Sequence, residues 1–186
     1  MFPDVSSFIS SINVIGEDLV FTQRNTIFTY TNGQFSTEEL AFQDSISDLK
    51  FMMPIPINSN KMNGEWEAAW MSVKRHDDID SGVIFYKYFV DNNWQEVYTT
   101  SSGNFNDLCI FGYNQVVAVG TNGLIAVLDG SNWSEIQPLT SEELLSVHLD
   151  ENMNGWAVGR NGTMLECTGG TWSVYENDVN YDLNVV

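Results

Sequence analysis

Two stretches of this chain match each other at a constant offset of 39 residues, without a gap. Residues 118–123 read AVGTNG and residues 157–162 read AVGRNG, and Trp133 recurs as Trp172. A repeat of this length restricts the chain to architectures in which one small structural unit is stacked several times. No other feature of the sequence limits the fold as strongly.

Each repeat carries the pattern of four short β-strands. In the clearest one, apolar runs at 108–111, 116–120 and 124–128 are followed by a fourth strand at 133–136. An Asn-Gly pair separates the second run from the third, and Asn-Gly readily takes the positive φ angles of a tight turn. Four antiparallel strands joined by tight turns form one blade of a β-propeller. The period extends backward once more, because Trp94 precedes Trp133 by the same offset.

We therefore predict an all-β fold, a small β-propeller of about four four-stranded antiparallel blades within one domain, 1–186. The expected blades cover residues 8–46, 47–104, 105–143 and 144–179. The first two are degraded copies, and an insertion interrupts the repeat over 36–65. The prolines of the segment 51–60 exclude it from a central strand.

After the fourth blade, residues 181–186 alternate like one further strand, with Tyr181, Leu183 and Val185 on one face. An orphan strand presents unpaired backbone groups and therefore needs a partner. Two outcomes stay open at this stage. The strand closes the ring by joining the first blade, or it serves as a strand-exchange edge for another subunit.

The charge of the chain excludes some partners. It has 25 acidic and 7 basic residues, a formal net charge of −18. Such a field repels nucleic-acid phosphates and anionic membrane surfaces, so neither nucleic-acid binding nor membrane insertion is expected. No signal peptide and no apolar stretch of membrane-spanning length is visible, which predicts a cytoplasmic or virion-associated protein. Cys109 and Cys167 are expected as buried core residues without a disulfide.

Residues 155–164, followed by Gly169-Gly170-Thr171-Trp172, resemble the repeat of the photosystem II assembly factor family. They are also similar to the sialidase-type (BNR, Asp-box) propeller repeats, and the match is good over residues 106–175. The resemblance implies mostly non-catalytic binding scaffolds, with some glycosidases. One repeat keeps the Asp of the Asp box, Asp129, whereas the next has Thr168. Glycosidases of this type use an arginine cluster and normally six blades, for which this chain is too short.

Several residues are candidates for binding. Trp66 and Trp70 lie outside the repeated Trp position, so they are candidates for a sugar-stacking surface. The three arginines, Arg24, Arg75 and Arg160, are candidates for contacts on a rim. Arg24 and Arg160 are expected in the same turn, between the second and third strands of their blades.

A calcium loop is the weakest candidate. Asp150, Asn152 and Asn154 alternate like the first ligands of such a loop, but the twelfth position is Asn161 and lacks the bidentate carboxylate. A polar turn is the alternative interpretation, and we expect no metal and no cofactor.

The sequence thus favours a non-catalytic protein-interaction or assembly scaffold, with other protein subunits as partners. The assembly would be a homo-oligomer or a larger complex, for example with the chain as a structural or decorating component of a phage virion. A carbohydrate-binding propeller, lectin-like or related to glycosidases, is the alternative. We do not expect an enzyme.

Overall fold

The computed structural model describes residues 9–15, 18–40, 45–52, 68–75, 81–88, 93–112 and 114–186. Within these residues the chain forms four antiparallel sheets, each of four strands that follow one another in sequence order. The prediction of four antiparallel four-stranded sheets is thereby confirmed. None of the described segments forms a helix long and apolar enough to cross a membrane.

The strands of the first two sheets are β1 (Ser11–Ile15), β2 (Asp18–Gln23), β3 (Thr26–Thr31), β4 (Gln34–Glu39), β5 (Ser45–Met52), β6 (Ala68–Arg75), β7 (Ser81–Tyr88) and β8 (Gln95–Thr100). Those of the last two are β9 (Phe105–Gly112), β10 (Gln115–Gly120), β11 (Ile125–Asp129), β12 (Asn132–Glu135), β13 (Leu144–Leu149), β14 (Gly155–Gly159), β15 (Met164–Thr168) and β16 (Thr171–Val174). The insertion predicted over 36–65 contains the end of β4 and all of β5, with which the second sheet begins, whereas residues 53–67 lie outside the described residues.

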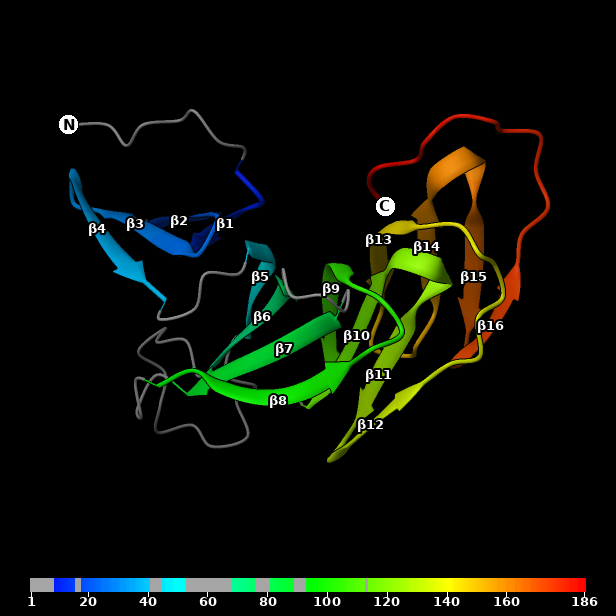
Figure 1. The fold of residues 1–186 in the computed structure, drawn as a ribbon, viewed down its shortest axis with the longest axis horizontal. Coiled ribbons are helices and arrows are strands. Elements are labelled where there is room, and N and C mark those ends of the chain that lie inside the picture. The colour runs from blue at the N-terminus through cyan, green and yellow to red at the C-terminus, as the bar shows by residue number, and fades with distance from the viewer. Residues whose placement is uncertain are drawn as a thin grey trace.

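The four sheets follow one another along an arc, from β1–β4 at one end to β13–β16 at the other (Figure 1). Their first strands lie on the inner side, where β1 contacts β5, β5 contacts β9, and β9 contacts β13. We call β1, β5, β9 and β13 the inner strands. No strand ladder in the described part of the chain joins the last sheet to the first.

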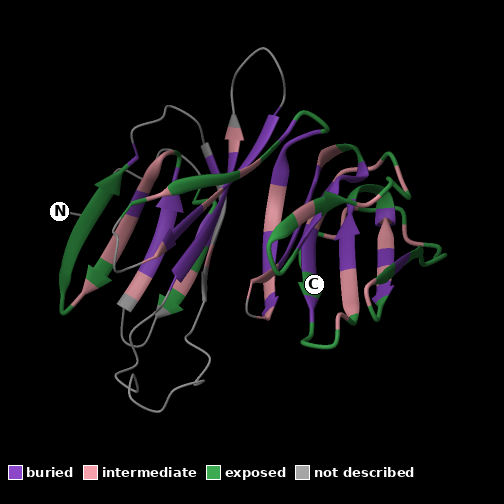
Figure 2. Ribbon diagram, turned by 90° about the horizontal axis from the view of Figure 1, so that it is seen from below, coloured by how far each residue is buried: buried purple, intermediate pink, exposed green. Residues whose placement is uncertain are grey.

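Apolar layers between successive sheets form the core, and Figure 2 shows the buried residues concentrated in the middle of the sheets. Each layer joins two neighbouring sheets; the last one, for example, contains Val117 of β10 and Leu165 of β15, both fully buried. The repeated tryptophans belong to these layers, since Trp94, Trp133 and Trp172 each pack against a different cluster. Cys109 and Cys167 are buried and free, as expected.

The turns between the second and third strands repeat in detail in the last two sheets. Short 3-10 turns, Thr121–Gly123 and Arg160–Gly162, carry Asn122 and Asn161 at φ values of 57° and 53°. Asn tolerates this left-handed conformation better than most residues, which explains the Asn-Gly signal in the sequence. The Arg160 N–H donates to the Glu143 carbonyl at 2.9 Å, as Thr121 does to Asn104 in the preceding sheet.

The chain that leaves each of these sheets crosses over the turn. At Gly123 this is the connection to the last sheet, and at Gly162 it is the segment that leads to residues 181–186. A Cβ added to Gly123 would overlap the backbone oxygen of Thr140, and one added to Gly162 would overlap that of Val179. Backbone therefore lies on backbone at both crossings. Only glycine fits here, because each position also has a positive φ.

Side-chain hydrogen bonds join the outer edges of neighbouring sheets. The buried Lys87 of β7 pairs with Glu38 of β4 at 3.1 Å. Glu135, at the end of β12, accepts hydrogen bonds from the hydroxyls of Tyr98, Thr100 and Ser102. Partial burial raises the pKa of Glu135, but the three hydroxyl donors outweigh it and hold the pKa below its ordinary value.

The predicted strand over 181–186 is not formed in this chain. Instead, Asp182 binds the turn Arg160–Gly162: its carboxylate accepts from the Arg160 guanidinium and from the Asn161 N–H. The Leu183 N–H donates to the carbonyl of Gly159 at 2.9 Å. These contacts hold 181–186, which we call the tail, against the last sheet, and no second strand of the described residues lies along it to complete a ladder.

Replacing Gly162 by alanine should cost about 3 kcal/mol of unfolding free energy, because the new methyl group meets the Val179 carbonyl. Gly169→Ala is the matched control in the same sheet. Gly169 also has a positive φ, but no atom lies within 4 Å of an added Cβ, so only about 1 kcal/mol should be lost. Urea denaturation measures both, and equal losses would disprove the crossing as the cause.

Glu135→Gln should destabilise the protein near neutral pH and matter less in acid. Because the folded-state pKa is lowered, the contribution of the carboxylate is present above the ordinary glutamate pKa and is lost as the pH falls through the folded value. Urea unfolding of both proteins from about pH 7 to about pH 3 tests this. A stability difference that is constant over this range would contradict the assignment.

Candidate interaction site

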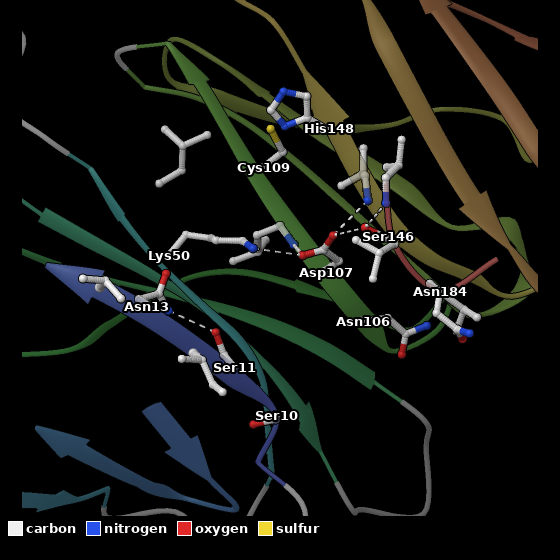
Figure 3. Close-up of a pocket in the computed structure, with 18 residues that line it drawn as sticks. Ser10, Ser11, Asn13, Lys50, Asn106, Asp107, Cys109, Ser146, His148 and Asn184 are labelled. Carbon is white, nitrogen blue, oxygen red and sulfur yellow. Dashed lines mark hydrogen bonds and ion pairs between the residues drawn. The ribbon is translucent and has the colours of Figure 1, made fainter. Parts of the chain in front are cut away.

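The inner strands converge on a pocket of about 570 Å³ at the concave side of the arc. Its walls come from β1, β5, β9 and β13 together with the tail residues Asn184, Val185 and Val186 (Figure 3). It is the place where the first and last sheets both contribute to one surface. The pocket and the tail together are the candidate site.

Asp107 of β9 is the central polar residue of this pocket. One carboxylate oxygen, Oδ2, accepts from the Ser146 hydroxyl and from the Val147 N–H of β13, each at 2.9 Å. The other oxygen, Oδ1, accepts from the Leu108 N–H at 2.9 Å and lies 3.4 Å from the Lys50 ammonium of β5. One carboxylate therefore connects three inner strands, as the dashed lines in Figure 3 show.

Other polar groups surround Asp107. The Asn106 amide donates to the Leu144 carbonyl at 2.8 Å, which joins β9 to the start of β13. On β1, the Asn13 amide donates to the Ser11 hydroxyl at 3.1 Å. The Lys50 side chain is 38% exposed and belongs to the pocket lining. The lining is thus mixed, with hydroxyl, amide and one charged pair among apolar residues such as Val14 and Val185.

Sequence reasoning missed Asp107 and Ser146, although the repeat contains the signal for them. The two residues are 39 positions apart and therefore occupy the same place in successive repeats. Because neighbouring inner strands lie side by side, equivalent positions of two repeats meet across them. Aligning polar residues of the inner strands at the repeat offset would have found this pair. Lys50 has no such signal, since the insertion breaks the repeat in the second sheet.

The structure corrects the candidate aromatic surface. Trp70 of β6 is only 4% exposed and packs against Tyr86 and Trp133 in the core. It is therefore no platform for stacking a sugar, because it lies in the apolar layer between the second and third sheets, against the Trp133 ring. Trp66 lies outside the described residues.

The arginines do not form one carboxylate-binding cluster in the described residues. Arg24 is exposed in the turn between β2 and β3, and Arg160 lies in the corresponding turn of the last sheet. Arg160 already has two acidic partners. The hydrogen bond to Asp182 is the main cause that raises the pKa of its guanidinium, and the hydrogen bond to Glu143, at 3.1 Å, is the next. Arg160 therefore fixes the tail. Arg75 ends β6, and its side chain is outside the described residues.

The calcium candidates form a polar turn between β13 and β14. Asp150 Oδ1 accepts from the backbone N–H groups of Asn154 and Asn152, at 2.8 and 2.9 Å, and these bonds lower the pKa of Asp150. The Asn154 side-chain oxygen accepts from the Gly169 N–H. Oxygens that a cation would need are thus engaged by backbone donors. Over the described part of the chain, no group of three or more His, Cys, Asp or Glu residues could hold a metal.

Comparison with known proteins adds no relative. No protein-family model matches the chain, and no curated protein matches it. The fold and the site are therefore interpreted from their own geometry.

Asp107→Ala should lower the unfolding free energy by about 2 kcal/mol, because the Val147 N–H and the Ser146 hydroxyl lose their acceptor. Asp129→Ala, at the exposed end of β11, is the matched control and should change stability by less than about 0.5 kcal/mol. Urea unfolding compares the two variants. A loss for Asp107→Ala as small as that of the control would show that this carboxylate does not hold the inner strands together.

Proposed function

We propose that this chain is a non-catalytic protein-interaction scaffold, built as a small β-propeller whose four sheets are its blades. The architecture is supported by four serial four-stranded meanders and by the arrangement of their first strands around one pocket. In such a fold the sheets supply rigidity, and binding takes place at the surfaces that the repeat leaves uncovered.

One observation carries the proposal: the tail runs along the last sheet in the same way as the segment that leads into β13 runs along the sheet before it. β9 begins at Phe105 and β13 begins at Leu144. Leu183 of the tail follows Leu144 at the same spacing as Leu144 follows Phe105. The crossing over Gly162 repeats the crossing over Gly123. Asn184, Val185 and Val186 then line the pocket beside β13. The tail is in the position of a further inner strand, and no strand of the described residues pairs with it.

A strand in this position is suited to pairing with another protein. Unpaired backbone N–H and C=O groups of an edge give affinity to an extended segment, and neighbouring side chains give specificity. The acidic field of the chain, at −18, favours partners with basic flanks. The function we propose is therefore to hold other protein subunits through strand addition at the tail and the pocket.

The mass of the particle isolated from its native cells tests this function. We expect a particle heavier than the 21.0 kDa of one chain, measured by size exclusion with light scattering. A strict monomer that captures no protein would contradict the proposal.

Two variants at one position then test the tail edge. Asn184→Pro removes a backbone N–H and should release the partner, whereas Asn184→Ala keeps that N–H and should retain it. If both variants keep the native particle mass, the tail edge is not where the partner binds.

A further inference from the structure

A hydrogen bond of the tail repeats one of the preceding inner strand at the 39-residue offset. The Val186 N–H donates to the Ser146 hydroxyl at 3.3 Å, and the Val147 N–H donates to Asp107 Oδ2 at 2.9 Å. Donor and acceptor both move by one repeat between these two bonds. The tail therefore lies beside β13 in the register in which β13 lies beside β9.

This register determines which backbone groups of the tail face away from β13. Hydrogen-bonded and non-hydrogen-bonded pairs alternate along an antiparallel ladder. Val147 directs its N–H to β9, so the backbone groups of Ser146, one residue earlier, point to β14, where Ser146 is paired with Val158. Val185 is the tail residue equivalent to Ser146, and it is 83% exposed. Within the described part of the chain, no hydrogen bond engages the Val185 backbone.

The last two inner strands each pair with a strand that ends in glycine. Leu144 of β13 pairs with Gly159, and one repeat earlier Phe105 pairs with Gly120. A Cβ added to Gly159 would lie 2.1 Å from the backbone oxygen of Glu143, and the same overlap occurs one repeat earlier. In both repeats, the N–H that follows the glycine donates to that oxygen at 2.9 Å. Backbone therefore excludes a side chain at this position.

The same pairs, moved to the tail, define the segment that would complete its ladder. A glycine would lie opposite Leu183, with the following N–H directed at the Asp182 carbonyl. The residue before the glycine would pair with Val185, and this position is valine in both repeats. The residue before that would pair with Val186, and this position is a fully buried alanine in both repeats. The pattern is Ala-Val-Gly, antiparallel to the tail.

A folded second copy of this chain cannot supply that segment from its described strands. The two Ala-Val-Gly runs, 118–120 and 157–159, lie in β10 and β14. Both are interior strands with a paired neighbour on either side. The segment must therefore come from another protein.

The free face of the last sheet favours one added strand over a complete further sheet. Half of the six buried residues that the third sheet contributes to the layer before it become polar one repeat later. They are Cys109, Phe111 and Val127, which correspond to His148, Asp150 and Glu166. Polar residues on the outer face are typical of a terminal repeat. A full sheet would have too few apolar groups to pack on.

We propose that the tail binds an extended segment of another protein, antiparallel and in this register, in which a small residue, a branched apolar residue and a glycine follow one another. The inference rests on the proposed interaction function and specifies the partner segment that this function requires. Backbone hydrogen bonds at Val185 would give affinity, and the glycine opposite Leu183 would give specificity.

NMR titration of the isotope-labelled full chain with a synthetic peptide tests the proposal. The peptide has the sequence of residues 154–160, Asn-Gly-Trp-Ala-Val-Gly-Arg, with blocked ends. We expect the largest shift changes at the amides of the tail, and slower hydrogen exchange of the Val185 N–H because it gains an acceptor. A few backbone hydrogen bonds give weak affinity, so peptide concentrations up to about 1 mM are needed.

The control peptide exchanges the alanine and the second glycine, so its composition and charge are unchanged. It places a methyl group opposite Leu183 where, as at Gly159, backbone oxygen would collide with it. We expect it to bind at least about tenfold more weakly. Equal affinity of the two peptides would show that the register is wrong.

Two variants of the chain test the pairing residue. Val185→Pro removes the N–H that faces the added strand and should weaken the first peptide at least about tenfold, whereas Val185→Ala keeps it and should bind within about twofold. Val185 is exposed, so both variants should unfold at the wild-type urea concentration. Equally tight binding by the two variants would remove Val185 from the interface.

A chain that binds neither peptide would overturn the inference. A native particle heavier than one chain would then leave the scaffold function intact, with only the partner segment wrong. No peptide binding together with a monomer from cells would contradict both. Shifts of the Val185 amide that depend on protein concentration alone would make a second copy the occupant and would also overturn the inference.

Discussion

The structure depends on the close crossing of backbone over backbone at the ends of its sheets. Each chain segment that leaves an outer strand must return to the inner side before the next sheet begins. At Gly123 the connection to the last sheet does so by passing directly over the preceding turn, and at Gly162 the segment that leads to the tail follows the same path. Any side chain at either glycine would collide with it. This crossing fixes where the next inner strand starts. The apolar layers can then form between sheets because successive sheets begin at equivalent positions.

The contacts of Asp107 also follow from the equivalent starting positions of the inner strands. Inner strands that start at equivalent positions bring equivalent residues together, so a carboxylate from one repeat meets a hydroxyl from the next. The carboxylate also takes up a backbone N–H of β13 that would otherwise face the pocket without an acceptor. A charged residue in this position is stabilised by its own donors and by Lys50. The pocket lining therefore combines this hydrogen-bonded carboxylate with apolar residues such as Val14 and Val185.

The repeat in the sequence predicted the four sheets, because period, turn residues and apolar alternation all indicated the same unit. It could not predict the conformation of residues 181–186. The alternation there indicates a strand, but strand formation needs a neighbour, and Asp182 is instead held by Arg160. Trp70 was misjudged because its position outside the repeated Trp site says nothing about burial, which the packing of the second sheet against the third decides.

The serial arrangement gives the molecule a mechanical property. The four sheets are connected through three apolar layers, and β1 and β13 touch the same pocket without pairing. If each sheet tilts slightly against its neighbour, the tilts at the three layers add up along the arc. The distance between the first and last sheets then changes by their combined effect. The pocket touches both end sheets, so its width would change with that distance. A protein segment bound between β1 and the tail would stiffen all three layers at once, and tension on the end sheets would be felt first at that segment.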